Sequence, residues 1–307
     1  MMNKYSKWNN TSYYPNCNRT WEESCRYNTE KILYSTPVEL LVTAHYTRKD
    51  YDLDDIQRHS LIRVAASHGL VRQQLKKYLI MQGFNIDNFF DDKLNKMVQA
   101  GYLTSIKISN MLSSKNITLY DLGERGIEEL KNMDIAYRNP ASEYAAGGDA
   151  IRYMRSCIVS NQIALQMMIS LRSMRRFFFR KIIRLKNDNT GVITPLLFQL
   201  YIQTDENNYA FEMACDTKSG KDTLKNKLDR LYETQDMLIP NTIIVIVAET
   251  YDHMKKIAEI VRQYKNKGLK LDFIFTHDSE WYYNTMGKCY AEARALGCSE
   301  LIGVNLI

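Results

Sequence analysis

The sequence predicts a protein of mixed α and β structure with two domains. Its 307 residues are enough for two hydrophobic cores. Apolar residues recur at helical spacing through most of the first half, whereas strand-like apolar runs alternate with amphipathic segments in the second half. A segment with Pro140, Gly147 and Gly148 separates the two halves and has the composition of a linker.

Composition and cysteine usage narrow the class of protein. Hydrophobic residues make up 45% of the chain and charged residues 25%, as in soluble globular proteins. No apolar run reaches the roughly 18 residues of a membrane span, and the N-terminal residues lack the apolar segment of a secretory signal. The six cysteines include no CxxC pair, which argues against structural zinc and favours a reduced, cytoplasmic protein. We therefore expect no membrane insertion, no cofactor and no metal, while the net charge of +6 permits a nucleic-acid partner.

The first domain is expected over residues 51–138. Residues 1–50 precede it as an N-terminal arm, ordered only where it docks, with a short element within 36–50. The domain should contain three helices, a two-stranded ribbon and a fourth helix, in this order: 53–68, within 69–84, within 85–103, 102–109, 116–122 and 124–133. Three helices followed by a ribbon with a polar tip is the order of a winged helix-turn-helix.

The third helix of this domain is the element expected to enter a DNA major groove. Its apolar stripe should face inward: Phe90, Leu94, Met97 and Val98. That leaves an outward face whose amides can read base edges and whose lysines can contact phosphates: Asn88, Lys93, Asn95, Lys96 and Gln99. The second helix and the ribbon can add backbone contacts: Arg72, Gln73, Lys107 and Lys115. Asp91 and Asp92 oppose phosphate binding, and a winged helix used only for protein contacts is the alternative.

The second domain is expected over 150–307, after a linker over 139–149. A helix over 150–171 should precede a series of strands: 175–185, 191–203, 208–215, 241–249 and 269–278. Amphipathic helices should precede the last two of these strands, and Ser219 with Asp222 should form a capping box for the first of these helices. The order indicates a restriction-endonuclease-like mixed sheet with helices on both faces.

The third of these strands, "NYAFEMAC", contains one acidic residue, Glu212. A metal-dependent nuclease of this layout needs an Asp at the preceding strand, an acid on the next one and a Lys two residues later. Leu196 and Leu197 stand at the first of these positions and Ala214 at the last. One carboxylate is a weak magnesium site, so we expect a nuclease-like domain without catalytic residues. Were it active, these residues would be the candidates: Glu212, Asp216, Lys218 and Lys225. The plainer alternative pairs Glu212 with a nearby Lys or Arg.

Two further features have both a functional and a structural interpretation. The run from Arg172 to Lys186 holds seven basic residues interleaved with three phenylalanines. It could follow phosphates while its aromatic rings stack on single-stranded bases, or it could be a buried strand with basic ends. Arg175 and Arg176 are our candidates for a basic flank that contacts DNA. His277–Asp278 ends a strand, where α/β proteins place active groups, although such a pair is more often a turn.

Several segments resemble one family. "LIRVAASHGLVRQQLKKYL", "DDKLNKMVQAGYL" and "ITLYDLGERGIEEL" look like the N-terminal winged helix of the replication-relaxation proteins of plasmids and integrative elements. Residues 193–233 are similar to the C-terminal half of that family, where Arg-Pro-Asp often precedes a strand and a Glu lies in the next. Pro195 and Glu212 match this pattern, whereas Thr194 and Leu196 depart from its Arg and Asp. The resemblance covers about residues 54–275.

The resemblance implies an accessory DNA-binding protein that acts at a replication or transfer origin. Its partners would be double-stranded DNA and other DNA-processing proteins, with a homodimer left open. Two alternatives remain at this point. One is a metal-dependent DNA endonuclease, and the other is a winged-helix transcriptional regulator whose second domain dimerises.

Overall fold

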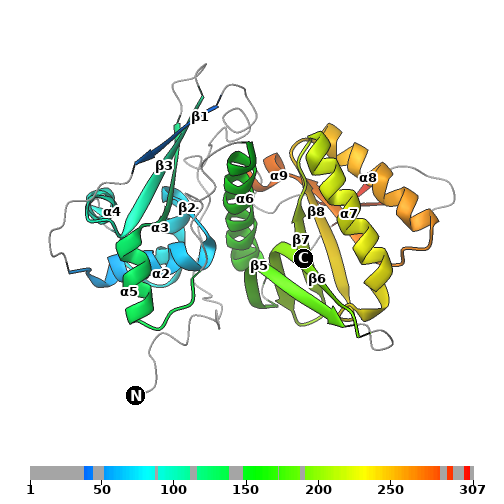
Figure 1. Ribbon diagram of the computed structural model, residues 1–307, viewed down its shortest axis with the longest axis horizontal. Helices are drawn as coiled ribbons and strands as arrows, with labels where there is room; N and C mark the ends of the chain where they lie inside the picture. The colour runs from blue at the N-terminus through cyan, green and yellow to red at the C-terminus, as the bar shows by residue number, and fades with distance from the viewer. Residues whose placement is uncertain are drawn as a thin grey trace. The chain divides into compact units, whose positions relative to one another are not determined.

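The computed structural model describes residues 38–43, 52–86, 89–110, 116–137, 148–171, 173–186, 191–283, 289–292 and 301–304. The chain has mixed α and β structure, and its described residues divide into two compact units (Figure 1). Unit 1 contains the described residues up to Leu165, and unit 2 contains those from Gln166 onward. Within the described ranges, no helix is both long enough and apolar enough to cross a membrane.

In its described residues, unit 1 combines four helices and the first part of a fifth with a small antiparallel sheet. Its elements follow one another as β1 (Val38–Thr43), α2 (Asp55–Ser67), β2 (Leu70–Val71), α3 (Arg72–Met81), α4 (Phe90–Gln99), β3 (Leu103–Asn110), β4 (Asn116–Leu122), α5 (Glu124–Asn132) and the start of α6 (Gly148–Ser170). The strand order is β1-β3-β4-β2. Strand β1 lies in the segment that we expected to be an arm; it pairs with β3 from Val38↔Asn110 to Thr43↔Ser105. The two-residue strand β2, which we did not predict, pairs with Leu119 and Tyr120 of β4.

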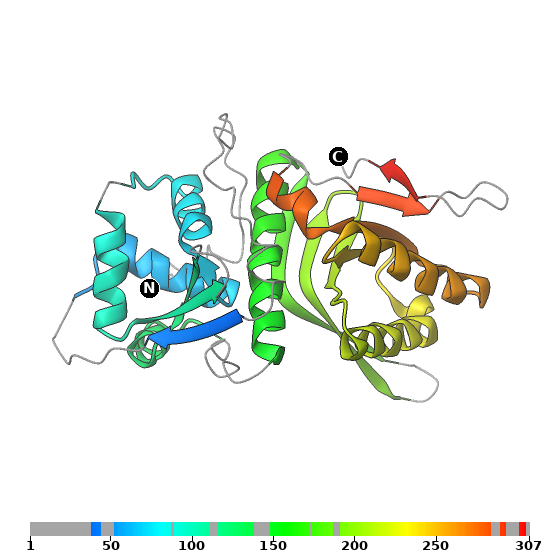
Figure 2. The ribbon, with the colours of Figure 1, turned by 90° about the horizontal axis from the view of Figure 1, so that it is seen from above.

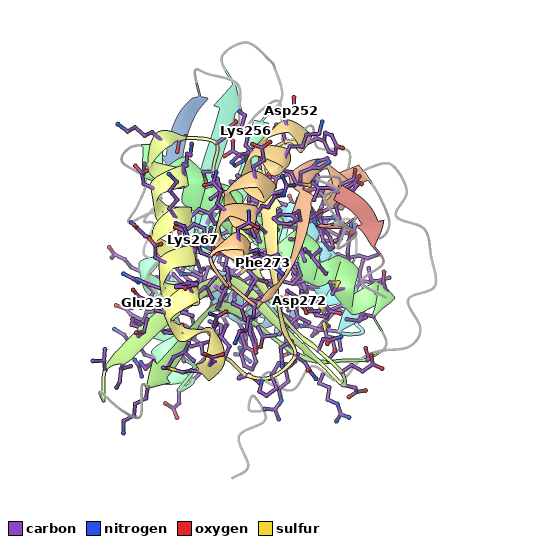
Figure 3. All side chains as sticks on the ribbon, turned by 90° about the vertical axis from the view of Figure 1, so that its right-hand side faces the viewer. Glu233, Asp252, Lys256, Lys267, Asp272 and Phe273 are labelled. Atoms are coloured by element: carbon purple, nitrogen blue, oxygen red, sulfur yellow. The ribbon has the colours of Figure 1, made fainter. Side chains whose placement is uncertain are left out.

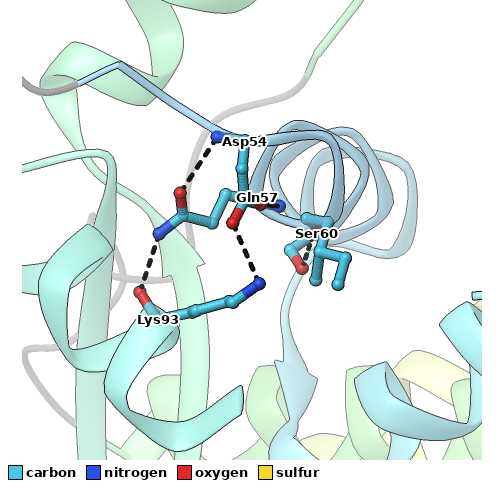
Figure 4. Close-up of polar contacts among 5 residues, drawn as sticks. Asp54, Gln57, Ser60 and Lys93 are labelled. Atoms are coloured by element: carbon cyan, nitrogen blue, oxygen red, sulfur yellow. Dashed lines mark hydrogen bonds and ion pairs between the residues drawn. The ribbon is translucent and has the colours of Figure 1, made fainter. Parts of the chain in front are cut away.

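The helices of unit 1 turn the expected stripes inward. On α4, Phe90, Leu94, Met97 and Val98 are all buried, as the spacing predicted. A capping box starts α2, since the Asp54 carboxylate accepts from the Gln57 amide at 2.8 Å and the Gln57 side chain accepts from the Asp54 amide at 3.1 Å (Figure 4). The Gln57 side-chain amide also donates to the Lys93 carbonyl at 3.3 Å. The same cap therefore fixes α2 against α4.

The first part of α6 belongs to unit 1. Asn161, which is fully buried, donates from Nδ2 to the Ser67 carbonyl at 3.1 Å and to the Gly69 carbonyl at 3.2 Å. These carbonyls lie at the C-terminal end of α2, where the last turn of a helix leaves acceptors without intrahelical partners. Gln74 of α3 donates to the Ile158 carbonyl at 2.7 Å, and the Tyr78 hydroxyl lies 3.3 Å from the Asn161 carbonyl.

These contacts move the boundary between the domains. We expected a linker over 139–149, of which 139–147 lies outside the described residues, and a second domain from residue 150. The units instead divide after Leu165: the first part of α6 donates to backbone carbonyls at the end of α2 and accepts from the Gln74 side chain of α3. A fragment meant to carry the first domain must therefore extend at least to Leu165.

Unit 2 is built on a mixed sheet. Among the described residues this sheet has seven strands in the order β11-β10-β9-β8-β7-β6-β5. Their bounds are β5 (Met174–Lys186), β6 (Ile193–Thr204), β7 (Asn208–Met213), β8 (Thr242–Ala248), β9 (Asp272–His277), β10 (Cys289–Glu292) and β11 (Leu301–Val304). Strands β7, β8 and β9 are parallel, while β5–β6, β6–β7, β9–β10 and β10–β11 pair antiparallel. The strands expected over 191–203 and 208–215 are β6 and β7, and they form an antiparallel hairpin.

Helices α7 (Lys218–Thr234) and α8 (Tyr251–Asn266) lie side by side on one face of this sheet (Figures 1 and 2). The core between them contains Leu224, Leu228, Ile257 and Val261 together with Phe198 and Ile246 of the strands. Their outer faces carry charges of both signs, among them Glu233, Asp252 and Lys256 (Figure 3). Thr217, and not the predicted Ser219, caps α7: its hydroxyl accepts from the Gly220 amide at 3.0 Å. A 3-10 turn (Gln235–Met237) follows α7, and the short helix α9 (Asp278–Tyr283) follows β9.

We predict that Asn161→Ala destabilises unit 1. The change leaves the Ser67 and Gly69 carbonyls buried without the Asn161 donor, which should lower the free energy of unfolding by about 2–3 kcal/mol. Urea unfolding of the full chain, followed by a signal from unit 1, measures this loss. Asn132→Ala, at the exposed end of α5, is the matched control and should change it by less than about 0.5 kcal/mol. Equal effects of the two variants would contradict the role given to Asn161.

Candidate functional site

The outward face of α4 is the first candidate site. Asn95, Lys96 and Gln99 are exposed on it, opposite the buried stripe. Asn88 and Lys115 lie outside the described residues. Lys107 is exposed on β3, between β1 and β4, and Gln73 is half-buried in the first turn of α3.

Two of the cations predicted to contact DNA form ion pairs with acidic residues of unit 1. Arg72 binds Asp91 with both ends of its guanidinium, and the second contact, from Nη2 to Oδ2, is 2.7 Å long. Lys93 Nζ lies 3.0 Å from Asp54 Oδ2, so it belongs to the cap of α2 (Figure 4). The pairing of Arg72 with Asp91 also neutralises one of the two acids that would repel phosphate from α4. The candidate contacts on this helix thus narrow to Asn95, Lys96 and Gln99.

Glu212 lies near the C-terminal end of β7, and its side chain points into the core beneath α7. It is 6% exposed, between Phe211 and Met213, which are also buried. Its carboxylate Oε2 forms an ion pair with Lys227 Nζ of α7. The same ammonium donates to the Leu197 carbonyl and lies 4.1 Å from the centre of the Phe198 ring. Burial lowers the pKa of Lys227, and the neighbouring Glu212 carboxylate opposes that shift.

The other predicted nuclease residues are not gathered around Glu212. Asp216, Lys218 and Lys225 are exposed, and Asp216 lies 3.4 Å from Lys256 Nζ of α8. Leu196 and Ala214 are buried in the apolar core, where a second carboxylate and a lysine would be needed. In the described part of the chain, no three His, Cys, Asp or Glu side chains form a group that could hold a metal ion. The arrangement around Glu212 is that of a buried ion pair.

From the sequence alone we named Lys225, and not Lys227, as a lysine that could reach Glu212. The signal was present, because Lys227 is three residues after Leu224 and four before Leu231, both of which face the core. Lys225 is one residue from Leu224 and so points about 100° away from it on the helix. Helical spacing therefore identifies Lys227 as the lysine that can reach Glu212.

His277 and Asp278, at the junction of β9 and α9, are buried rather than displayed. His277 Nε2 lies 3.4 Å from Glu280 Oε1, and its ring meets that of Tyr251 edge-on at 5.9 Å. Burial lowers the pKa of His277, while the Glu280 and Asp278 carboxylates raise it. Because these groups are packed against one another, this junction has a structural role in the fold.

Strand β5 carries the basic run. Arg175 and Arg176 are exposed at its start, and Arg175 forms an ion pair with Asp205. Phe179 is buried and Phe177 half-buried, and their rings contact each other edge-on at 5.5 Å. Phe178 packs against the core, and Lys181 Nζ lies 4.5 Å from the centre of the Phe178 ring. The three rings are thus used in packing, which disfavours stacking on single-stranded bases.

Comparison with known proteins adds little to this geometry. No protein-family model matches the chain, and no curated protein matches its sequence. A solved structure titled "Crystal structure of protein VC1899 from Vibrio cholerae" is similar to it at 12% sequence identity and a TM-score of 0.31. The similarity covers 79% of this chain and 56% of that one. At this level it has no bearing on fold or function.

We predict that removing either member of the Glu212–Lys227 pair destabilises unit 2. Glu212→Leu or Lys227→Met leaves one charge buried without its partner, which typically costs about 3–5 kcal/mol. The double variant removes both charges, and its free energy of unfolding should lie within about 2 kcal/mol of that of the natural chain. Denaturant unfolding of all four proteins gives the coupling energy.

Lys225→Met is the control for this cycle. It changes an exposed lysine two residues earlier on the same helix and should alter the free energy of unfolding by less than about 0.5 kcal/mol. Additive losses in the double variant would show that Glu212 and Lys227 do not depend on each other.

Proposed function

We propose that the chain is an accessory DNA-binding protein of plasmid or mobile-element replication or conjugative transfer. In this proposal unit 1 acts as a winged helix-turn-helix on double-stranded DNA. Unit 2 acts as a restriction-endonuclease-like domain without nuclease activity, which serves contacts with other DNA-processing proteins or with a second copy of the chain. The resemblance of residues 54–275 to the replication-relaxation family supports the setting.

The order of elements in unit 1 supports the DNA-binding part of the proposal. Helices α2, α3 and α4 precede the β3–β4 ribbon, and β2 lies between α2 and α3 and pairs with β4. This is the order in which a winged helix places its recognition helix beside a ribbon.

The exposed polar face of α4 is the observation that carries the proposal. Asn95 and Gln99 are four residues apart and therefore lie on one side of the helix, where Lys96, three residues before Gln99, is its other neighbour. Amides at such positions pair with adenine edges and a lysine binds phosphate, so this face can both read sequence and hold the backbone.

A metal-dependent endonuclease is the second candidate, and one observation favours it. Glu212 has a lysine beside it, as the nucleases of this layout require, although the lysine comes from α7 instead of β7. Burial argues against catalysis, because the side chains of Glu212 and Lys227 are 8% and 12% exposed and no second carboxylate from the described part of the chain joins them. Substrate and metal would have to displace the core to reach this pair.

We predict that Lys96→Ala weakens binding of the full chain to every duplex. One phosphate contact fewer should reduce the slope of log K against log salt by about 1. Binding is measured between about 50 and 200 mM salt, on the strongest duplex selected from a random library and on an unrelated duplex. Lys131→Ala, an exposed lysine on α5, is the control and should leave both affinities unchanged. Binding that does not respond to salt would count against the proposal.

Asn95→Ala and Gln99→Ala are expected to act differently from Lys96→Ala. If either amide reads a base, its loss should reduce discrimination between the selected and the unrelated duplex by about 1–3 kcal/mol. Equal weakening on both duplexes would show that the amide only meets the backbone. Footprinting across the origin and the promoters of the host element then distinguishes an origin accessory protein from a transcriptional regulator.

We predict no cleavage of supercoiled or linear DNA by the full chain in magnesium or manganese. The reason is that a single carboxylate, already paired with Lys227, offers few of the oxygen ligands that these ions demand. Gel analysis of nicked and linear products tests this. Glu212→Gln, verified to be folded, and Asp216→Asn, at an exposed position, are the variants to compare. Metal-dependent nicking that disappears in Glu212→Gln would make the nuclease the preferred function.

A further inference from the structure

Strand β5 concentrates positive charge at the edge of the large sheet. Among the described residues it is the last strand beyond β6, and it contains six basic residues and no acidic one: Arg175, Arg176, Arg180, Lys181, Arg184 and Lys186. Strand β6, its partner, contains no charged residue. The net charge of the whole chain is +6, so this one strand carries as much positive charge as the chain has in excess.

The two halves of β5 present opposite sets of side chains to the core. Upstream, Phe178 packs against the core beneath α7 and α8; downstream, Ile183 and Leu185 belong to it. Phe178 is five residues before Ile183 and seven before Leu185. Because both numbers are odd, a regular strand would put Phe178 on the opposite face from the other two. The switch occurs at Arg180, whose φ of 50° is left-handed, while the pairing register continues unshifted from Phe179↔Leu200 to Lys181↔Phe198.

As a result, the second half of β5 turns Ile182, Arg184 and Lys186 away from the core. Their partners on β6 are Leu197, Pro195 and Ile193. Ile182 is 47% exposed and Ile193 56%, and Arg184, Lys186 and Pro195 are exposed as well. Within the described residues neither Arg184 nor Lys186 forms an ion pair. Since β7 pairs only with Leu200–Gln203 of β6, this half of the hairpin is a ribbon two strands wide.

We propose that this ribbon, 181–186 with 193–198, is a second contact surface for duplex DNA, which rests on the function proposed for unit 1. A two-stranded ribbon is one of the elements that the major groove of B-DNA admits. Arg184 and Lys186 lie on one side of the strand, about 6.6 Å apart, and can bind phosphates. The apolar Ile182 and Ile193 suit thymine methyl groups.

Charge and packing select duplex DNA over other occupants. A second copy bound along the same ribbon by two-fold symmetry would bring basic side chains against basic side chains, which is unfavourable. Single-stranded nucleic acid would need aromatic rings for stacking, and the phenylalanines of β5 are packed upstream of the ribbon. A double helix needs only the cations and the small apolar groups that the ribbon exposes.

The test compares two double variants of the full chain that remove equal charge. Arg184→Gln with Lys186→Gln removes the two exposed cations of the ribbon, and Lys221→Gln with Lys225→Gln removes two exposed lysines of α7. Duplex affinity is measured from about 50 to 200 mM salt. The ribbon variant should reduce the slope of log K against log salt by about 2 and the affinity by about 10-fold or more. The α7 variant should change affinity by less than about twofold.

A charge-conserving variant, Arg184→Lys with Lys186→Arg, should restore both the slope and the affinity. An unchanged slope in the ribbon variant, or equal losses in the two charge-removing variants, would overturn the inference while leaving unit 1 as the DNA-binding part. Absence of duplex binding by the natural chain would instead refute the function proposed above. Loss of dimerisation in the ribbon variant, with DNA binding intact, would assign the ribbon to a second copy and overturn the inference.

Discussion

The buried contact between Glu212 and Lys227 is the interaction on which the chemistry of unit 2 depends. A carboxylate inside an apolar core is costly unless an opposite charge and hydrogen bonds compensate it. Lys227 supplies the charge, and the Leu197 carbonyl and the Phe198 ring occupy two further sides of its ammonium. In a metal-dependent hydrolase, a divalent ion would lie beside such a carboxylate. Here a cation from the protein lies there, so the pair stabilises the sheet against α7.

Ion pairs also limit which polar groups of unit 1 remain for a partner. Arg72 pairs with Asp91, and Lys93 with Asp54, and these contacts fix α4 beside the other helices. Asn161 satisfies carbonyls at the end of α2. Each group would have to leave a partner in the fold before it could bind DNA. Of the predicted contacts on α4, Asn95, Lys96 and Gln99 are exposed, so the proposed recognition face is narrower than the sequence alone indicated.

Local spacing predicted helices α2 to α8, strands β3 to β9 and the buried face of α4, because each of these follows from the period of apolar residues along one segment. What it missed depends on contacts between distant segments. Strand β2 has only two residues and exists through its pairing with β4. The boundary after Leu165 accompanies contacts of α6 with α2 and α3, among them those of Asn161, whose partners Ser67 and Gly69 are 94 and 92 residues away in the chain. The reversal of faces at Arg180 comes from one left-handed residue that no composition signals. Lys227 is the exception, since helical spacing did indicate it.

The distribution of charge suggests different roles for the two proposed DNA surfaces. Charges of both signs cover the outer faces of α7 and α8. On α4 the exposed Asp92 accompanies a single exposed lysine, Lys96. These surfaces therefore do not attract a polyanion strongly. Strand β5 has six cations and no acidic residue, and Arg175 pairs with Asp205. Attraction of this kind acts over about a Debye length, roughly 8–10 Å at moderate salt, and is indifferent to sequence. The amides of α4 act only at contact and depend on the base edge they meet. In the proposed function, β5 therefore supplies most of the affinity and its salt dependence, whereas α4 supplies the discrimination.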